Sequence, residues 1–235
     1  MIPVKICGIR RLDDALLSLD EGAWALGFIF HRPSPRFIDP VDAAALLAKI
    51  RERSGAEFRA VGVFVDWDLD ELNEVVREVG LDAAQLHGAE DPGYAASVEA
   101  AEVWKAFRVG PDFEASRPDD YPSKMRVLLD GWSPTEAGGT GEVFDWSIAR
   151  ACQETRPVFL AGGIDAGNIA AAIAEVRPAT MSVLLQDGNV IVSWTEPGAL
   201  QEAEKVTGPW NDVVGAGSPR VVTPDSRAMF YRVRH

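Results

Sequence analysis

The feature that most constrains this chain is a regular alternation of two hydrophobic patterns. Short runs of apolar, β-branched or aromatic residues are typical of buried strands, and the longer segments between them have the periodicity of helices. The short runs predict eight strands, at residues 4–7, 25–30, 59–65, 82–87, 103–107, 126–130, 157–162 and 179–185. The longer segments predict helices at 11–22, 39–54, 68–80 and 165–177, with a last helix at 198–206.

Eight strands, each followed by a helix, predict a single-domain α/β fold, the parallel (β/α)₈ TIM barrel. A length of 235 residues is sufficient for one such core. An open doubly wound sheet is the alternative, and it is disfavoured because no Gly-x-Gly-x-x-Gly follows the first strand. We expect residues 1–207 to form the barrel and residues 208–235 to form a C-terminal extension. That extension is interpreted as a disordered tail, a strap across the barrel or a partner-binding arm.

Charge and cysteine content exclude several classes of partner. The chain has 36 acidic and 23 basic residues and a formal net charge of -13, which repels nucleic acid and anionic membrane surfaces. The first residues pass directly into a short strand-like run, and nowhere do eighteen uncharged apolar residues occur together, so we expect neither secretion nor membrane spanning. Two cysteines, Cys7 and Cys152, form neither a disulfide framework nor a zinc motif, which indicates a reducing, cytoplasmic setting.

In a barrel of this class, chemistry belongs at the carboxyl ends of the strands and in the loops that follow them. Several residues with reactive or ligand-binding groups stand at those positions. We therefore expect them to line the same open end of the barrel, its mouth. They are Cys7, the loop at 31–36, Asp66, His87, Asp130, and Gly162 with Gly163.

Cys7 and Asp130 are candidates for an acid/base pair. Strand alternation places Cys7 on the same side of its strand as Lys5, and a thiol and a carboxyl on the inner side would face each other. A thiolate can take a proton from carbon, and a carboxylic acid can donate one to a ring oxygen. Alternatively, Cys7 is a small apolar packing residue, and Lys5 either favours the thiolate or pairs with a core carboxylate.

Six stretches, in this order, resemble the phosphoribosylanthranilate isomerase family over about residues 3–178: 5–10, 25–38, 61–65, 83–88, 128–146 and 160–165. The resemblance implies an aldose–ketose isomerase of tryptophan biosynthesis. Its reaction is the Amadori rearrangement of N-(5-phosphoribosyl)anthranilate to 1-(2-carboxyphenylamino)-1-deoxyribulose 5-phosphate. The expected partner is this small phosphorylated sugar amine, and neither a cofactor nor a metal is expected.

The resemblance also implies roles for individual residues. Cys7 would be the general base that removes the C2 proton, and Asp130 the general acid that protonates the furanose oxygen. Arg36 would meet the anthranilate carboxylate, although a solvated loop arginine is the alternative. His87 would touch the substrate or serve as a hydrogen-bonded structural residue.

Glycines near two of the strand ends suggest further functions. Gly162 and Gly163 would let backbone N–H groups approach a phosphate, as barrel phosphate sites do after strands 7 and 8. Three glycines after Asp130 predict either a loop that closes over the mouth or an ordinary connection. These are Gly138, Gly139 and Gly141. Cys152 and the tryptophans at 24, 104 and 146 are interpreted as packing residues.

The chain departs from the family pattern after the eighth predicted strand. Leu184, Leu185 and Gln186 stand where the family has a Ser-Ser-Gly-like turn, and Asp187 adds a negative charge. Asp187-Gly188 is a strong hairpin signal, so this strand is expected to turn back through residues 189–194.

Such a turn would remove donors that a phosphate needs. It leaves three hypotheses open: the isomerase itself, a barrel that binds a ligand or partner without turnover, and an isomerase of a sugar amine lacking phosphate. The oligomeric state stays open.

Overall fold

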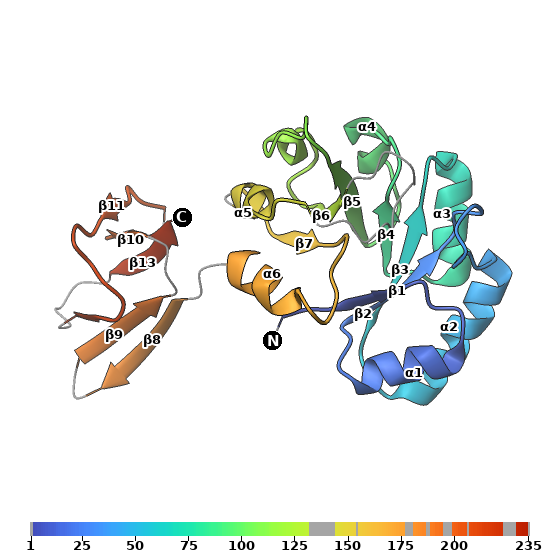
Figure 1. The fold of residues 1–235 in the computed structure, drawn as a ribbon, viewed down its shortest axis with the longest axis horizontal. Helices are drawn as coiled ribbons and strands as arrows, with labels where there is room; N and C mark the ends of the chain where they lie inside the picture. Colours follow the sequence, from blue (N-terminus) through green and yellow to red (C-terminus); the bar gives the residue numbers. More distant parts are fainter. Residues whose placement is uncertain are drawn as a thin grey trace. The chain divides into compact units, whose positions relative to one another are not determined.

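The computed structural model describes residues 2–131, 144–153, 155–176, 181–186, 189–194, 199–205, 207–222 and 229–234. The chain forms two compact units, Met1–Ala170 and Ala171–His235 (Figure 1). The predicted boundary after residue 207 lies within the second unit, and that division of the chain stays a prediction. Of the helices in the described ranges, none has the length and apolar character needed to cross a bilayer.

The first unit alternates strands and helices along the chain. Its strands are β1 (Lys5–Cys7), β2 (Ala25–Ile29), β3 (Arg59–Phe64), β4 (Ala83–Leu86), β5 (Glu102–Val109), β6 (Arg126–Gly131) and β7 (Val158–Leu160). The helices are α1 (Leu12–Asp20), α2 (Pro40–Ser54), α3 (Leu69–Val79), α4 (Pro92–Ala96), a 3₁₀ turn at Arg117–Asp120, and α5 (Ser147–Gln153). Helix α6 (Ile169–Val176) crosses the boundary between the units.

Strands β1 to β7 form one parallel sheet in chain order (Figure 1). Sequential parallel strands joined by helical crossovers are the arrangement from which a (β/α)₈ barrel is built. The α/β class and the first seven predicted strands are therefore confirmed, with strand ends that differ by one or two residues.

The helices begin where the sequence has capping residues. The carboxylate of Asp39 accepts a hydrogen bond from the N–H of Val41, and Pro40 is the first residue of α2. Asp68 caps α3 in the same way. A carboxylate satisfies N–H groups that have no partner inside the first turn, which explains why these two helix starts were predictable from the sequence.

The two faces of the sheet have different neighbours. Helices α1, α2 and α3 pack on the outer face, where their buried residues join alternate strand residues such as Leu26 and Phe64 in one large cluster (Figure 1). The inner face holds a smaller cluster made by Ala25, Val61, Ala83 and Trp104, with Trp24 and Phe159 against it. This separation is what the strand alternation dictates, because successive side chains point to opposite faces.

After the last residues of α6, the described strands of the second unit form two antiparallel sheets. These are β8 (Met181–Gln186), β9 (Asn189–Trp194) and β12 (Arg220–Val222) in one sheet, and β10 (Ala199–Ala203), β11 (Asn211–Asp212) and β13 (Phe230–Arg234) in the other. Gln186 pairs with Asn189, so β8 and β9 form the expected hairpin, whose two turn residues lie outside the described residues. A two-residue connection needs little chain entropy to bring its strands together.

The helix expected at 198–206 was wrong, because β10 occupies that segment. Its residues are good helix formers in isolation, but Leu200 is buried and the segment pairs with β13 on one side and β11 on the other. Tertiary pairing therefore overrides a weak local preference. Strands β11, β12 and β13 show that the described part of the predicted C-terminal extension is folded.

Candidate active site

Cys7 lies on the inner face of the sheet, at the carboxyl end of β1. Lys5 is paired with Ala25, a member of the inner cluster, and Cys7 is two residues further along the same strand. Its sulfur packs against Gly27 of β2, where a Cβ atom would stand 2.7 Å from the Cys7 Sγ. Gly27 thus makes room for the thiol, which is half-buried.

Asp130 lies on the same face, near the carboxyl end of β6. Trp104 of the inner cluster is paired with Arg126, and Asp130 is four residues beyond Arg126 on that strand. The Asp130 side chain is only 9% exposed. A buried carboxyl needs hydrogen-bond partners, and the structure supplies one from β4.

That partner is His87, the residue after β4. His87 Nε2 lies 3.1 Å from Asp130 Oδ2, and His87 Nδ1 lies 2.9 Å from Gln85 Nε2. Gln85 is 3% exposed, and its Oε1 accepts a hydrogen bond from the Lys5 ammonium of β1. Four polar side chains from β1, β4 and β6 are therefore connected across the inner face.

Gln85 was missed by the sequence reasoning. The signal was present, since Gln85 and His87 are two residues apart and so share a face of their strand. Lys5 was expected either to favour the thiolate or to pair with a core carboxylate. In the described part of the chain it forms no ion pair with an acidic side chain, and it donates to Gln85 instead.

Arg36 reaches the end of β1 from the loop after β2. Its Nη1 donates to the backbone oxygen of Cys7 at 2.9 Å, and its backbone N–H donates to Ser34 Oγ at 3.2 Å. Gly8 permits this approach, because a Cβ there would stand 2.6 Å from Arg36 Cδ. The side chain is exposed but anchored at the strand end, so it is held beside Cys7.

Gly162 follows β7 and lies against the acid. Its φ is +75°, and a Cβ on it would stand 2.7 Å from Asp130 Oδ1 and overlap the backbone nitrogen of Gly131. Only glycine leaves that oxygen uncovered on this side.

Gly163, with a φ of +66°, continues the turn toward α6. Its carbonyl oxygen accepts a hydrogen bond from Asn168 Nδ2 at 2.6 Å. The Asp165 carboxylate accepts from the N–H groups of Gly167 and Asn168, at 2.7 and 3.1 Å. Those two backbone donors are thus occupied by a carboxylate of the chain itself.

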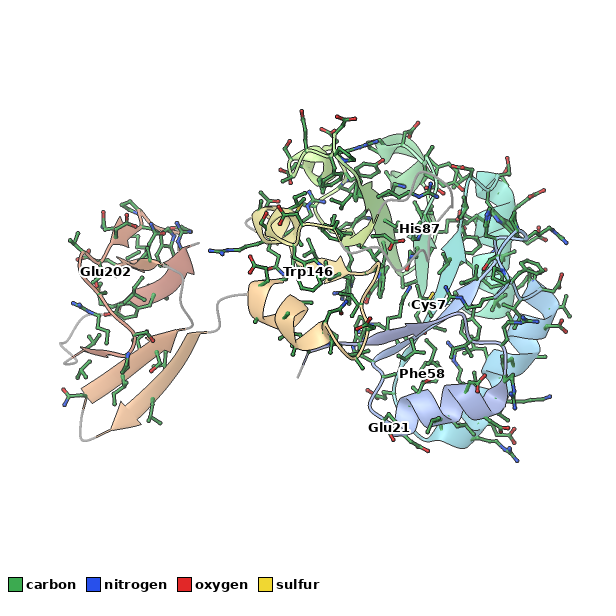
Figure 2. The ribbon with its side chains drawn as sticks, in the orientation of Figure 1. Cys7, Glu21, Phe58, His87, Trp146 and Glu202 are labelled. Carbon is green, nitrogen blue, oxygen red and sulfur yellow. The ribbon has the colours of Figure 1, made fainter. Side chains whose placement is uncertain are left out.

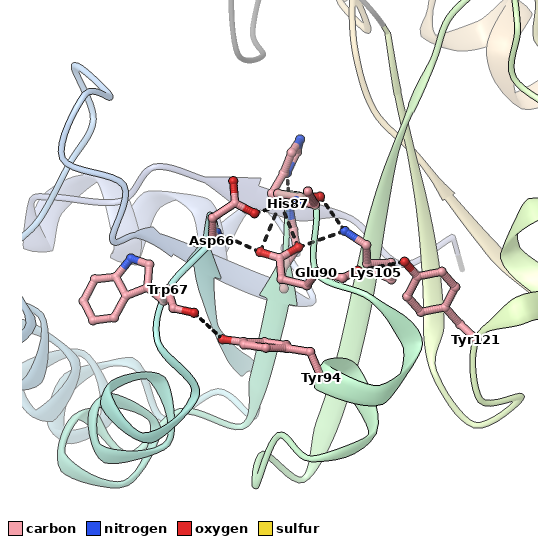
Figure 3. A network of polar contacts seen from close by, with 10 residues as sticks. Asp66, Trp67, His87, Glu90, Tyr94, Lys105 and Tyr121 are labelled. Atoms are coloured by element: carbon pink, nitrogen blue, oxygen red, sulfur yellow. Dashed lines mark hydrogen bonds and ion pairs between the residues drawn. The ribbon is translucent and has the colours of Figure 1, made fainter.

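A buried ion pair supports the loops beneath His87 (Figure 3). Lys105 Nζ lies 2.9 Å from Glu90 Oε2 and 2.7 Å from the carbonyl oxygen of Gly88. The Glu90 carboxylate also accepts from the N–H groups of Asp66 and Gly88. Burial lowers the pKa of Lys105, and the Glu90 charge opposes that shift.

Asp66 belongs to this supporting network. It has a positive φ of +52°, and its Oδ1 accepts from the N–H of Ala89 at 2.6 Å. These bonds tie the loop after β3 to the loop after β4, which carries His87.

Other predicted residues lie elsewhere. Gly138, Gly139, Gly141 and Asp187 fall outside the described residues. The Cys152 thiol is buried in α5 and donates to the Ala115 oxygen at 3.3 Å. Burial, with a smaller effect of Asp119, raises the Cys152 pKa to about 11. Among the described residues, no cluster of three His, Cys, Asp or Glu side chains could hold a metal ion.

These features define a class of protein: an α/β protein with a seven-stranded parallel sheet and with a thiol and a hydrogen-bonded carboxyl at the carboxyl ends of its strands. Figure 2 shows Cys7 and His87 within this sheet. Comparisons with known proteins identify the family. The family model described as N-(5'phosphoribosyl)anthranilate (PRA) isomerase matches residues 4–185.

Individual relatives agree with this match. The N-(5'-phosphoribosyl)anthranilate isomerase of Geobacter sp. (strain M21) is 45% identical over 184 residues, which cover 78% of this chain and 87% of that protein. The crystal structure of the phosphoribosyl anthranilate isomerase from Thermus thermophilus has 39% identity and a TM-score of 0.66, covering 74% of this chain and 83% of that one. The chain therefore belongs to the N-(5'-phosphoribosyl)anthranilate isomerase family, and the predicted barrel class is confirmed.

A third match is a structure with a ligand. Phosphoribosyl anthranilate isomerase in complex with reduced 1-(o-carboxyphenylamino)-1-deoxyribulose 5-phosphate is 34% identical, with a TM-score of 0.64. The match covers 76% of this chain and 84% of that one.

Proposed function

We propose that the chain catalyses the Amadori rearrangement of N-(5'-phosphoribosyl)anthranilate to 1-(2-carboxyphenylamino)-1-deoxyribulose 5-phosphate, a step of tryptophan biosynthesis. Family membership supports the reaction, and the site supplies the two groups that it needs. The reaction takes place in the cytoplasm, a location consistent with two free cysteines in the chain.

Asp130 is the general acid of the first step. It donates a proton to the furanose oxygen, the bond from C1 to that oxygen breaks, and the nitrogen lone pair forms the C=N bond of a protonated Schiff base. The carboxylate that remains keeps the hydrogen bond from His87. Gly162 places no side chain against Asp130 Oδ1, and a sugar is expected to approach the acid from that side.

Cys7 is the general base of the second step. Its thiolate removes the C2 proton, the electrons of that bond form a C1=C2 double bond, and the C=N electrons return to nitrogen. The enolamine becomes the ketose when C1 gains a proton and the C2 hydroxyl loses one. The protonated Schiff base acidifies the C2 proton, so a base of modest strength is sufficient.

Arg36 binds the carboxylate of the anthranilate ring. Its Nη1 is held by the backbone oxygen of Cys7, which orients the guanidinium next to the base. A guanidinium presents several N–H donors in one plane, so part of the fork stays available for a planar carboxylate.

The observation that carries the proposal is the shared inner face of Cys7 and Asp130 at the carboxyl ends of parallel strands. In barrel enzymes these ends carry the chemistry. A chain of hydrogen bonds also connects the two strands. It runs from Lys5 of β1 through Gln85 and His87 to Asp130 of β6.

Turnover of freshly made phosphoribosylanthranilate, followed by the loss of its fluorescence, tests the proposal. Cys7→Ala and Asp130→Asn should each lower kcat by about 10² to 10⁴-fold, the usual contribution of a positioned acid or base. Arg36→Ala should mainly raise KM. Cys152→Ala and Asp82→Asn are the matched controls and should keep kcat. Cys152 is buried in α5, and Asp82 precedes the amino end of β4, where it pairs with Arg51.

No consumption by the wild-type protein at high concentration would refute the proposal. That result would favour a barrel of the same family that binds a ligand or partner without turnover.

A second candidate is the same isomerisation on a sugar amine that lacks the phosphate. Two observations favour it: β8 pairs with β9 as a hairpin, and the backbone N–H groups of Gly167 and Asn168 already bind Asp165. Both reduce the number of donors available to a dianion. Comparing kcat/KM for ribosylanthranilate with and without the 5'-phosphate separates the candidates, since a loss of tenfold or more without phosphate would exclude the second one.

A further inference from the structure

In the chain of hydrogen bonds that begins at Lys5, the donor of each bond can be identified from the chemical groups involved. An ammonium group can only donate, so the Gln85 atom that faces Lys5 must be the carbonyl oxygen Oε1. The amide nitrogen Nε2 then faces His87, and it too can only donate. The opposite orientation of the amide would set two donors against each other at Lys5.

This direction determines where the His87 proton sits. Nδ1 accepts from Gln85 and therefore carries no hydrogen, so the single proton of the ring is on Nε2. Nε2 lies 3.1 Å from Asp130 Oδ2 and donates to it. Every bond from Lys5 to Asp130 thus has its donor on the Lys5 side.

Burial makes this arrangement specific. Gln85 is 3% exposed, and the side chains of His87 and Asp130 are 14% and 9% exposed. Water has little access with which to replace a lost partner, so reversing one bond would leave buried groups unsatisfied.

We infer that Lys5 and Gln85 are positioning residues that hold His87 in the Nε2–H tautomer, so that the transferable proton of Asp130 is on Oδ1. This inference rests on the proposed function. Oδ2 receives the His87 N–H, and a second hydrogen there would oppose it. Oδ1 is the oxygen on the side of Gly162, where a Cβ would stand 2.7 Å from it.

The positions of the proton before and after the transfer are then defined. Asp130 starts as a carboxylic acid with its hydrogen on Oδ1 and gives that proton to the furanose oxygen. The carboxylate that forms keeps the bond from His87, and the ammonium of Lys5 stands at the far end of the chain of bonds. No other group must move or change its protonation in this step.

The histidine spectra of the intact chain test the tautomer directly. With ¹⁵N-labelled histidine, wild-type His87 should show a bare Nδ1 and a protonated Nε2. Gln85→Glu replaces the amide by a carboxylate of the same shape, which accepts on both oxygens. His87 should then carry a proton on Nδ1, while the signals of His31, which is outside this network, should not change.

Kinetics test the consequence for catalysis. Gln85→Glu should lower kcat by at least about tenfold, and by no more than the 10² to 10⁴-fold that general acid catalysis supplies. KM should stay within about twofold, because Gln85 is only 3% exposed and acts through His87. A purely structural role would not couple a change of the His87 tautomer to a selective loss of kcat.

Lys5 provides a second variant that places no new charge on Gln85. Lys5→Met keeps the length of the side chain but removes the donor that holds Oε1, so His87 should populate both tautomers and kcat should fall. Lys5→Arg keeps a donor and should retain the wild-type spectrum and most of kcat.

A wild-type His87 with its proton on Nδ1 would overturn the inference, and so would an unchanged kcat in Gln85→Glu and Lys5→Met. Failure of the proposed function looks different. In that case wild-type protein would not consume phosphoribosylanthranilate, yet His87 would still show the Nε2–H form. The tautomer assignment would then stand and the role in proton delivery would fall.

Discussion

The two ends of the seven-stranded sheet are built from opposite kinds of contact. At the amino ends of the strands, the rings of Trp104 and Phe159 stack at 4.7 Å, and Trp24 stacks on both. The guanidinium of Arg59 lies 4.5 Å from the Trp24 ring centroid. Glu102 bridges Arg59 and Arg126 with N···O distances of 3.1 and 2.6 Å.

The carboxyl ends hold polar side chains instead of stacked rings. Cys7, His87 and Asp130 stand there, next to glycines that leave space around the thiol and the carboxyl. Their contacts are few and directional, and they come from separate strands.

This difference indicates that residues at the amino ends of the strands mainly stabilise the fold, whereas residues at the carboxyl ends carry the chemistry. At the amino ends, the stacked aromatic rings bury apolar surface. The Glu102 carboxylate pairs with the two arginine side chains beside them. On the inner face, the carboxyl ends instead present the thiol and the carboxyl at the end of the sheet where barrel enzymes carry their chemistry. Variants at the two ends should therefore change different measured quantities, and four predictions test that division.

The largest effect is expected at the amino ends, from Trp104→Ala. Trp104 is fully buried, so its removal should lower the free energy of unfolding by about 3–5 kcal/mol. Denaturant unfolding measures this loss. In Trp104→Ala the loss of stability should be the main effect, whereas Asp130→Asn should keep the unfolding midpoint and lose kcat. A Trp104→Ala protein with unchanged stability would contradict the division.

Gly27→Ala should produce a smaller, mixed effect at the carboxyl ends. The new Cβ would stand 2.7 Å from Cys7 Sγ and 3.1 Å from Cys7 Cα. Overpacking of this kind costs about 1–3 kcal/mol in stability, and moving the thiol should also lower kcat. Gly217→Ala is the control, because nothing lies within 4 Å of a Cβ at that position. Wild-type values of both quantities in Gly27→Ala would show that the thiol is not confined there.

Glu102→Gln should have a pH-dependent effect on stability alone. Burial tends to raise the pKa of Glu102, but hydrogen bonds from Arg126, Arg59 and Trp104 outweigh it and lower the pKa. A lowered folded-state pKa gives stability that is full above the ordinary glutamate pKa and is lost as the pH falls through the folded-state value.

Urea unfolding at several pH values measures this contribution. The stability difference between wild type and Glu102→Gln should be largest near neutral pH and should shrink in acid. A difference that stays constant with pH would contradict the assignment.

The smallest effect concerns the two thiols and needs no substitution. Iodoacetamide should modify half-buried Cys7 in the folded protein and should spare Cys152, which is 1% exposed and has a pKa of about 11. Mass spectrometry of the peptides measures both, and urea should release Cys152. Substrate should protect Cys7. Modification of Cys152 before Cys7 would be inconsistent with the structure.

The strands and helices of the first unit were largely predictable, because their signals are local. Apolar runs identified β1 to β7, and the helical periodicity of residues 39–54 identified α2. Strand alternation placed Cys7 on the same side of its strand as Lys5, but it did not show that this side and that of Asp130 are the inner one. Such patterns depend on residues that are neighbours in the chain, so the amino-acid sequence determines them by itself.

Other features depended on which segments meet in space. The helix expected at 198–206 became β10 because residues 211–212 and 230–234 pair with it. No periodicity within the segment could have shown that pairing, since the partners are distant in the chain.

The amino-acid sequence by itself determined the order of the elements and the chemical groups at the strand ends. Only the tertiary structure decided that Gln85 connects Lys5 to His87, and that Asp165 occupies N–H groups before α6. The reason is that a hydrogen bond depends on distances of a few tenths of an ångström between side chains from different strands. The hydrophobic pattern of a strand determines the face of the sheet on which a side chain lies. The packing of the strands determines which atom of another side chain it contacts.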